Sequence, residues 1–322
     1  MLFQFLKKMK NKCLYCYEPL TTPGDFHEKC SREFFGLTIP PQIPFGIEQM
    51  AELAKNVVER SVAVPGVQAK LSLTLVKNNQ ETSATRLIVV GALGGNYIFK
   101  PPSDRFPEMP ANEHVTMRIA EAMGIRVVPS SLIRLASGEL SYITRRIDRT
   151  PTGEKIHMLD MFQITEAFDK YKSSMEKVGR ALHQYSDNTL LDKIFFLELS
   201  LVCFLTGNND MHLKNFSMIE TNSGWGLSPA YDLLNVALLI PEDAEELALT
   251  LNGKKRKLKI EHFEKLGKEL ELSDKQTEGV FKRMIVNKPK AIQWIDNSFL
   301  SEGMKTSYKS LLESRYYQVK LT

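Results

Sequence analysis

The pattern of apolar and polar residues divides the chain into a strand-rich part followed by a helical part. LSLTLV at 71–76 and RLIVVG at 86–91 are rich in aliphatic and β-branched residues, and the polar segment KNNQETSAT separates them. This pattern predicts two strands joined as a hairpin. A shorter strand, NYIFK, follows and ends at Lys100, because the next two residues are prolines, which cannot donate to a sheet.

A helix and two more strands complete the strand-rich part. The segment NEHVTMRIAEAMG has helical spacing, and we expect Asn112 to cap its beginning and Gly124 to follow its end. Strands are predicted at 126–135 and 140–146, on either side of a Ser-Gly turn. Residues 61–146 are therefore predicted to form an antiparallel sheet that carries one helix.

The remainder of the chain is mostly helical in pattern. Helices are predicted at 158–168, 174–184 and 190–206, and three or four more are predicted between 260 and 318. The polar loop GNNDMHLKN at 207–215 is followed by a short hairpin and then by AYDLL. We expect a small Cys/His segment at 1–40, a β-rich lobe at 45–150 and an α-helical lobe at 151–322.

Composition places the chain among ordinary globular proteins. Hydrophobic residues make up 43% and charged residues 25% of the 322 residues, which excludes fibrous and largely disordered classes. A net charge of +4 is too small to indicate nucleic-acid binding by itself. The most apolar run, at 194–207, is interrupted by Glu198 and predicts a buried helix. With four cysteines and no secretory signal pattern, we expect a cytoplasmic protein.

Asp210, Asn215 and Asp232 form the pattern that most clearly indicates chemistry. Four residues separate Asp210 from Asn215 in the polar loop, and Asp232 follows the predicted hairpin. Phosphoryl transfer needs a carboxylate beside the accepting hydroxyl and oxygen ligands for Mg²⁺. Protein kinases use the same Asp-x4-Asn spacing, followed by a metal-binding Asp. The alternative is a polar surface loop with ordinary turn residues, and the kinase-like pattern upstream argues against it.

Lys100 belongs to that upstream pattern. A strand lysine in kinases contacts the phosphates and pairs with a glutamate on the next helix. Glu113, near the start of the following helix, is the candidate partner. The alternatives are a solvated lysine at a strand end and an acidic residue favoured by the helix dipole. The loop SVAVPGVQAK at 61–70 contains one glycine, Gly66, and is by itself a poor match to a phosphate-binding loop.

Three of the four cysteines lie near the N-terminus, together with a histidine. The spacing is Cys-x2-Cys-x10-His-x2-Cys, formed by Cys13, Cys16, His27 and Cys30. Two pairs of soft ligands at this spacing can bind one structural Zn²⁺, which would stabilise a segment too short to form a core. The alternative is that the thiols pack as small hydrophobic groups and the histidine lies at the surface.

Six motifs follow one another in order along the chain: PGVQAKLSL, YIFKPP, NEHVTMRIAEAMGI, RRIDR, GNNDMHLKNFS and AYDLL. This set resembles the HipA family of bacterial serine/threonine kinases, the toxin halves of toxin–antitoxin systems. The match runs from about Ser61 to Asn235. The resemblance implies an α+β, two-lobed, protein-kinase-like fold of the HipA type, with a β-rich N-terminal lobe and an α-helical C-terminal lobe. It also implies ATP and Mg²⁺ as cofactors.

The resemblance implies roles for individual residues. Asp210 matches the catalytic base, Asn215 and Asp232 match the Mg²⁺ ligands, and Lys100 matches the phosphate-binding lysine. The other positions that match ATP-binding residues are Pro65, Gly66, Val67, Gln68, Ala69 and Lys70 of the nucleotide-covering loop, Arg145, Arg146 and Ile147 of the adenine hinge, and His212, Lys214 and Tyr231.

The chain departs from the family pattern at two points. HipA-like chains usually begin with an extra subdomain, whereas about 60 residues precede the loop here, which resembles the short HipT type whose missing subdomain is a separate small protein. The family places an autophosphorylated serine three residues before the loop glycine. That position is Ala63 here, so Ser61 is the remaining candidate for autophosphorylation.

The resemblance also implies partners and a cellular role. We expect an aminoacyl-tRNA synthetase as protein substrate with inhibition of translation, a helix-turn-helix antitoxin and a small HipS-like protein as partners, DNA only through the antitoxin, and no membrane. A small-molecule phosphotransferase and a catalytically idle partner-binding protein are the alternatives. The NDMHLKN and PGVQAK loops favour the protein kinase over the former, and the intact set of Asp210, Asn215, Lys100 and Asp232 argues against the latter.

Overall fold

The chain forms two compact units in the computed structural model. The model describes residues 11–50, 52–53, 70–77, 85–90, 94–102 and 104–321. The first unit comprises Met1–His114 and Pro129–Gly153, and the second comprises Val115–Val128 and Glu154–Thr322. The described part of 1–40 thus lies in the first unit, and residues 115–128 lie in the second.

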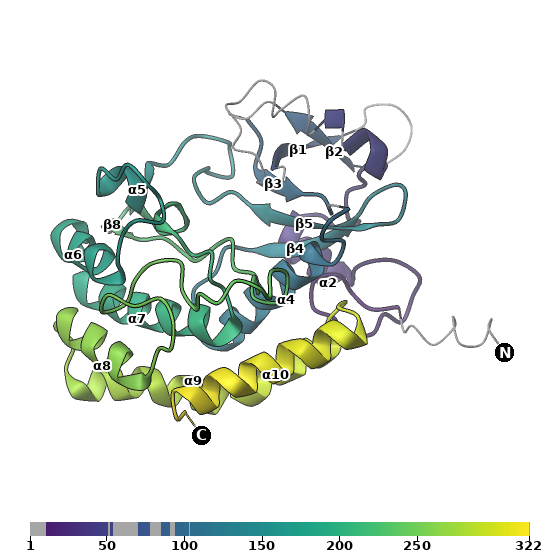
Figure 1. The fold of residues 1–322 in the computed structure, drawn as a ribbon. Coiled ribbons are helices and arrows are strands. Elements are labelled where there is room, and N and C mark those ends of the chain that lie inside the picture. The colour runs from purple at the N-terminus through teal and green to yellow at the C-terminus, as the bar shows by residue number, and fades with distance from the viewer. Residues whose placement is uncertain are drawn as a thin grey trace. The chain divides into compact units, whose positions relative to one another are not determined.

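The first unit contains a five-stranded sheet with the order β2-β1-β3-β5-β4 (Figure 1). All its neighbouring strands are antiparallel, as the sequence predicts. The hairpin is confirmed, with Lys77 opposite Thr85 at its closed end. The strands are β1 Leu71–Lys77, β2 Thr85–Val90, β3 Tyr97–Lys100, β4 Ser130–Arg134 and β5 Leu140–Arg145.

The predicted strand at 126–135 is too long at its beginning, since β4 starts at Ser130. Val127 instead forms a parallel bridge to Ala230, and the amide of Val128 donates to the carbonyl of Ala230 at 2.9 Å. The partner of this short stretch lies about a hundred positions away in the chain, so apolar alternation could not distinguish it from the sheet strand that follows.

The N-terminal segment shares the core of the first unit. Helix α2, Glu28–Phe35, buries Cys30, Phe34 and Phe35 on one face and ends at Gly36 in the left-handed conformation. These side chains belong to one hydrophobic cluster with residues of the sheet. The sheet residues in that cluster include Leu71, Leu73, Leu87, Tyr97, Phe99, Ile133 and Ile143. The segment is therefore packed as part of the β-rich unit.

Helix α4, Met109–Ala122, begins three residues before the position that the sequence predicts. The amide of Met109 donates to Phe106 and that of Asn112 to Glu108, so the backbone already turns before Asn112. Asn112 is consequently a fully buried residue inside the helix and not its cap. The other end is as predicted, with Gly124 at a φ of +95° just beyond the last turn.

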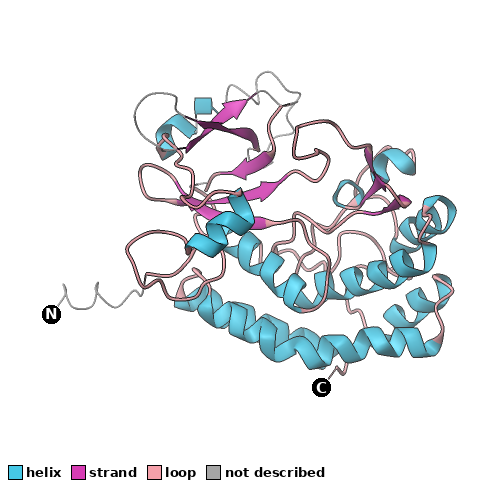
Figure 2. Ribbon diagram, turned by 180° about the vertical axis from the view of Figure 1, so that it is seen from behind, coloured by secondary structure: helices cyan, strands magenta, loops and turns pink. Residues whose placement is uncertain are grey.

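The second unit is built around helix α7, Thr189–Thr206, which confirms the predicted buried helix. Helices α6, α8, α9 and α10 all pack on α7, as does strand β8 (Figure 2 shows the helices in cyan). The surrounding helices are α6 Met175–Tyr185, α8 Ile260–Glu269, α9 Asp274–Asn297 and α10 Glu302–Gln318. In the part of the chain that the structure describes, no helix is both long and apolar enough to cross a membrane.

A three-stranded antiparallel sheet, ordered β6-β7-β8, completes the second unit. Its strands are β6 Met158–Asp160, β7 Ser217–Thr221 and β8 Gly224–Leu227. The hairpin after the polar loop is confirmed, but the helix predicted at 158–168 is wrong. Residues 158–160 pair with β7, and helix α5 spans only Met161–Ile164. Asp160 ends the strand and caps α5, because its carboxylate accepts the amide of Gln163.

Candidate active-site residues and a cysteine–histidine cluster

The loop that carries Asp210 begins where α7 ends. Gly207 has a φ of +71°, and its amide donates to carbonyls of the last turn of α7. A Cβ at Gly207 would lie 2.7 Å from Oδ1 of Asn235, so a larger residue would clash as well as being strained. The Oδ1 atom of Asn208 then accepts the amide of Asp210 at 3.3 Å. The loop is thus fixed on the end of a buried helix.

Asp210 and Asn215 lie together, as their spacing predicts. Nδ2 of Asn215 donates to the backbone carbonyl of Asp210 at 3.0 Å, across the short 3₁₀ helix η1, Leu213–Asn215. Because the amide nitrogen of Asn215 is used in this contact, its Oδ1 atom is the one left to act as a ligand. The arrangement places a carboxylate and an amide oxygen on one rigid turn.

Tyr171 is a site residue that the sequence did not reveal. Its hydroxyl donates to Oδ1 of Asp210 at 2.7 Å, and its ring stands edge-on to that of His212 at 5.0 Å. Burial is the main reason that the pKa of Tyr171 is raised, and the Asp210 carboxylate adds to it, so the hydroxyl remains a proton donor near neutral pH. The two residues are 39 positions apart, and no motif links them.

His212 is buried in the same loop and directly precedes η1. Burial lowers the pKa of His212, although Asp210 and Asp232 oppose the shift, so the ring is neutral near pH 7. Among the described residues, no protein group hydrogen-bonds Nδ1 of His212. Lys214 is exposed at the end of this turn, with its ammonium 4.7 Å from the ring centre of Phe162.

Tyr231 and Asp232 follow strand β8. The Tyr231 hydroxyl donates to the carbonyl of Lys214 at 3.0 Å and contacts the Ser217 hydroxyl at 2.5 Å, which ties this segment to η1. Burial raises the pKa of Tyr231, so this hydroxyl keeps its proton. Asp232 has a φ of +61°, a left-handed conformation that costs energy in residues other than glycine. Strain of this kind is often found at functional sites.

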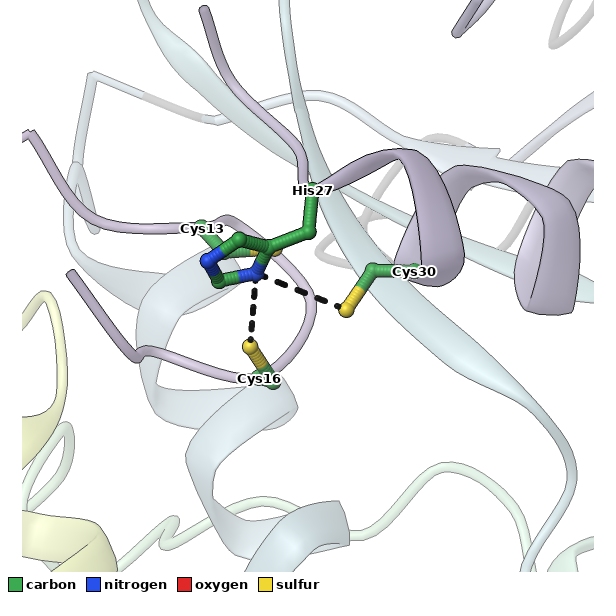
Figure 3. A group of neighbouring side chains, drawn as sticks. All are labelled: Cys13, Cys16, His27 and Cys30. Atoms are coloured by element: carbon green, nitrogen blue, oxygen red, sulfur yellow. Dashed lines mark hydrogen bonds between the residues drawn. The ribbon is translucent and has the colours of Figure 1, made fainter. Parts of the chain in front are cut away.

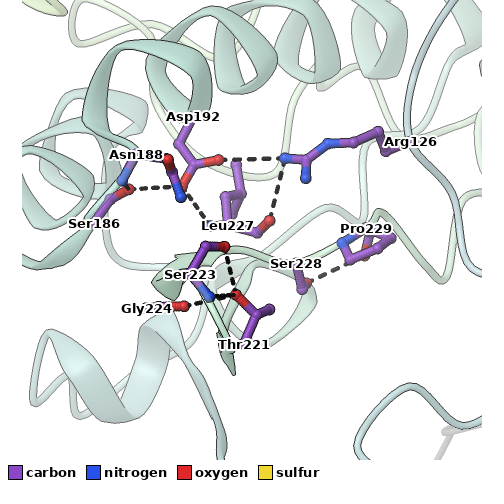
Figure 4. A network of polar contacts seen from close by, with 10 residues as sticks. All are labelled: Arg126, Ser186, Asn188, Asp192, Thr221, Ser223, Gly224, Leu227, Ser228 and Pro229. Atoms are coloured by element: carbon purple, nitrogen blue, oxygen red, sulfur yellow. Dashed lines mark hydrogen bonds and ion pairs between the residues drawn. The ribbon is translucent and has the colours of Figure 1, made fainter.

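A polar network around the buried carboxylate of Asp192 holds the end of β8, just before Tyr231 and Asp232 (Figure 4). The carboxylate of Asp192, on α7, accepts the amide of Leu227 at 2.6 Å and the Ser186 hydroxyl at 2.7 Å. Arg126 donates to both the Asp192 carboxylate and the Leu227 carbonyl at 3.3 Å. Asp192 is 2% exposed, so these donors compensate for burying its charge. The network fixes the strand that leads to the candidate metal ligand.

In the first unit, Lys100 and Glu113 form the predicted ion pair. Nζ of Lys100 lies 2.5 Å from Oε1 of Glu113, and the two side chains are 5% and 1% exposed. This burial excludes the alternative that Lys100 is a solvated lysine at the end of a strand. Because α4 begins at Met109, Glu113 lies beyond its first turn, where a favourable interaction with the helix dipole is weak. The pair is therefore a specific buried contact between β3 and α4.

The structure describes four of the remaining predicted nucleotide-binding residues of the first unit: Lys70, Arg145, Arg146 and Ile147. Ser61, Pro65, Gly66, Val67, Gln68 and Ala69 lie outside the described residues. Lys70 is exposed, and Ile147 is half-buried. Arg145 uses its side chain elsewhere, because its guanidinium donates to the backbone carbonyls of Glu33 and Phe34. Arg146 forms an ion pair with Asp148 at 2.6 Å.

The four predicted zinc ligands also lie together (Figure 3). The ligand atoms of Cys13, Cys16, His27 and Cys30 are all within 4.8 Å of one another, and the three cysteines are free thiols. A hydrogen bond with the Cys16 thiol lowers the pKa of Cys13, and nearby backbone amides act in the same direction against the effect of burial.

Comparison with known proteins relates the chain to one family. The model of the HipA-like C-terminal domain matches residues 62–292. A Haemophilus influenzae protein named "Putative kinase" is 28% identical over 211 residues, and "Putative kinase Y4dM" of Sinorhizobium fredii is 32% identical over 244 residues. The matches cover 61% and 71% of this chain but only 59% and 58% of those relatives, so the chain spans less than two thirds of their length.

Similarity extends to a named toxin. The "Serine/threonine-protein kinase toxin HipA" of Shewanella oneidensis is 27% identical over 213 residues, which are 59% of this chain and 47% of the toxin. The structure of Shewanella oneidensis HipA, solved with HipB and operator DNA, aligns with a TM-score of 0.67 at 21% identity. That alignment covers 84% of this chain and 71% of the HipA chain.

A second solved structure supports the same fold. The Helicobacter pylori proinflammatory kinase CtkA aligns with a TM-score of 0.51 at 17% identity, over 77% of this chain and 90% of CtkA. At these low sequence identities, the two structures are evidence about the fold alone, and they confirm the predicted kinase-like α+β architecture. Since the family model covers well over half of the chain, the protein belongs to the family of the HipA-like C-terminal domain.

Proposed function

We propose that the protein is an ATP-dependent serine/threonine protein kinase and the toxin of a toxin–antitoxin system. The observation that carries this proposal is the Asp210 loop, in which Tyr171 donates to the Asp210 carboxylate and Asn215 donates to the Asp210 backbone carbonyl. The buried Lys100–Glu113 pair supports it independently. The family and the names of the relatives agree with this reading.

Asp210 is proposed as the general base. A serine or threonine hydroxyl of the substrate gives its proton to the Asp210 carboxylate as its oxygen attacks the γ-phosphorus of ATP, and ADP leaves. Tyr171 donates its hydrogen bond to one carboxylate oxygen and so orients the other toward the substrate. The buried, neutral His212 limits how the Tyr171 ring can turn, because the two rings are in edge-on contact.

The donor atoms fit Mg²⁺ and ATP. Asn215 offers an amide oxygen and Asp232 a carboxylate, both hard oxygen ligands of the kind that Mg²⁺ prefers. Mg²⁺, when bound, would neutralise charge on the transferred phosphoryl group. The resemblance assigns the phosphates to Lys100, the adenine to Arg145, Arg146 and Ile147, and the covering of the nucleotide to residues 65–70. We also propose His212, Lys214 and Tyr231 as residues beside the nucleotide, on the same resemblance.

The substrate and partners are proposed from the family alone. We infer that an aminoacyl-tRNA synthetase is phosphorylated and translation is inhibited. An antitoxin is expected because the Shewanella oneidensis HipA structure contains HipB and operator DNA. A small HipS-like protein would be a second partner, and DNA would be reached only through the antitoxin. Ser61 remains the candidate for autophosphorylation.

The decisive experiment is transfer of γ-labelled phosphate from ATP in a cell lysate. Wild-type protein should label protein, and Asp210→Asn should reduce the rate by at least ~10²-fold, because a positioned base is lost while the shape of the side chain is kept. Glu278→Gln is the matched control, since it makes the same chemical change at an exposed position on α9 and should leave the rate unchanged.

Two results would contradict the proposal. Label confined to small molecules would identify a small-molecule phosphotransferase. No transfer by wild-type protein in the presence of Mg²⁺ would identify a catalytically idle binding protein.

A further inference from the structure

We propose that Cys13, Cys16, His27 and Cys30 bind one structural Zn²⁺, and that this site supports the beginning of α4, where Glu113 pairs with Lys100. The proposal does not depend on the function proposed above, because it concerns how the first unit is held together.

The distances fit a tetrahedral metal site. Nδ1 of His27 lies 3.4 Å from Sγ of Cys16 and 3.7 Å from Sγ of Cys30 (Figure 3). Zinc–sulfur and zinc–nitrogen bonds of about 2.3 and 2.0 Å at tetrahedral angles place such atoms about 3.5 Å apart. All four ligand atoms lie within 4.8 Å of one another, so they surround one point and need only small movements to share a metal ion.

The second nitrogen of His27 identifies which atom faces the cluster. Nε2 lies 3.1 Å from the carbonyl oxygen of Pro19, which can only accept a hydrogen bond, so Nε2 carries the proton. Nδ1 then presents its lone pair to the two sulfurs. Zinc-bound histidines almost always have their other nitrogen anchored in this way.

The backbone holds both pairs of ligands in place. The amide of Tyr17 donates to the carbonyl of Cys13 at 2.9 Å and closes a tight turn around Cys13 and Cys16. Tyr17 itself adopts a φ of +65° at the end of this turn. His27 and Cys30 lie at the beginning of α2, where an interval of three residues places side chains on one face of a helix. The Cys13–Tyr17 turn and the beginning of α2 thus bring the four ligands together, although neither has a large core of its own.

Tyr17 connects the cluster to α4. Its hydroxyl lies 2.8 Å from Nδ1 of His114 in a buried contact, and the two rings stand edge-on at 5.2 Å. His114 follows Glu113 directly in the sequence. A displacement of the turn that contains Tyr17 would therefore remove a support from the part of α4 that holds the Lys100–Glu113 pair.

The same segment is attached to the sheet at three further points. The amide of Leu132 in β4 donates to the carbonyl of Leu14 at 3.3 Å. Arg134 forms an ion pair with Asp25 at 2.8 Å. Arg145 at the end of β5 donates to the last turn of α2. The four ligands and the N-terminal residues that make these three contacts lie in the same short segment, so metal binding would order the segment and its contacts with the sheet together.

Zinc content is the first test. Protein purified without chelator should contain about one zinc per chain, and Co²⁺ should replace it with the intense visible absorption of a tetrahedral thiolate site. His27→Ala should lose most of the zinc. The matched control, His157→Ala, changes an exposed histidine outside the cluster and should keep it. Well under one zinc per chain with no cobalt spectrum, or a disulfide among the three cysteines, would overturn the metal site.

Hydrogen exchange tests the link to α4. Chelation should speed exchange in β4 and at residues 112–116 of α4, whereas α9 should be unaffected. Tyr17→Phe should keep its zinc yet raise exchange at 112–116 by about 2- to 10-fold, the effect of losing one hydrogen bond. Because this variant keeps the metal and the aromatic ring, it separates the link from loss of folding. Unchanged exchange after chelation and in Tyr17→Phe would overturn the supporting role.

Discussion

Replacing Lys100 with methionine removes one member of an ion pair that has almost no access to solvent. The two side chains are 5% and 1% exposed, and the charged atoms are 2.5 Å apart. Glu113 would keep its buried carboxylate without this counter-charge. Breaking a buried pair from one side costs about 3–5 kcal/mol, much of it the penalty of the charge left behind. We expect Lys100→Met to lower the free energy of unfolding by about that amount.

The double variant Lys100→Met/Glu113→Leu separates stability from function. With both charges removed, apolar side chains fill similar space, and such replacements are often neutral or stabilising. We therefore expect the double variant to recover most of the stability lost in Lys100→Met. Phosphotransfer should remain reduced in both variants, because neither has an ammonium group to contact the phosphates of ATP.

Urea unfolding and an ATP-binding titration measure the two effects. Lys309→Met is the matched control, since its ion pair with Asp296 has a similar distance of 2.6 Å but side chains 39% and 49% exposed. The control should change stability by about 0–1 kcal/mol. A cost for Lys100→Met no larger than for the control would refute the burial argument. Normal ATP affinity in the double variant would refute the role of Lys100 in phosphate binding.

Three further predictions concern the second unit. Asp232→Ala should remove the enhancement of ATP affinity by Mg²⁺, and a full enhancement in titrations with and without the metal would exclude Asp232 as a ligand. Tyr171→Phe should slow phosphotransfer about tenfold with little change in ATP affinity, because a hydrogen bond to a charged group is lost, and an unchanged turnover would contradict its positioning role. The pKa of His212 is lower in the folded protein than in the unfolded chain, so the folded protein keeps its full stability from this residue above pH 6.5, the ordinary histidine value. This contribution should be lost as the pH falls through the folded pKa, because the unfolded chain then binds a proton more readily. His212→Gln should flatten the pH dependence of urea unfolding in that range, and an equally steep dependence would assign it to other groups.

Local patterns were enough to predict several parts of the fold and the candidate site. The β1–β2 hairpin follows from two apolar stretches around a polar turn. Asp210 and Asn215 meet because they share one loop, and Lys100 meets Glu113 because β3 is followed directly by α4. In each case the interacting residues are close in sequence.

Contacts between distant segments could not be predicted in this way. Strand β6 forms because 158–160 pair with β7, although helical spacing suggested otherwise. Tyr171 reaches Asp210 only through the packing of the second unit. The spacing of the cysteines indicated a local metal site, but nothing in it revealed that α2 completes the core beneath the sheet.

The attachment of the N-terminal segment to the sheet has a consequence for synthesis on the ribosome. His114, which contacts Tyr17, is synthesised 97 residues after it. Arg145, which donates to the Phe34 carbonyl of α2, is synthesised 111 residues after Phe34. At 5–20 residues per second, the segment is synthesised about 5–20 s before the rest of its core. Its own four ligands span only 18 residues, 13 to 30, and are complete within the first seconds. A metal captured there would keep the nascent segment folded until the sheet arrives.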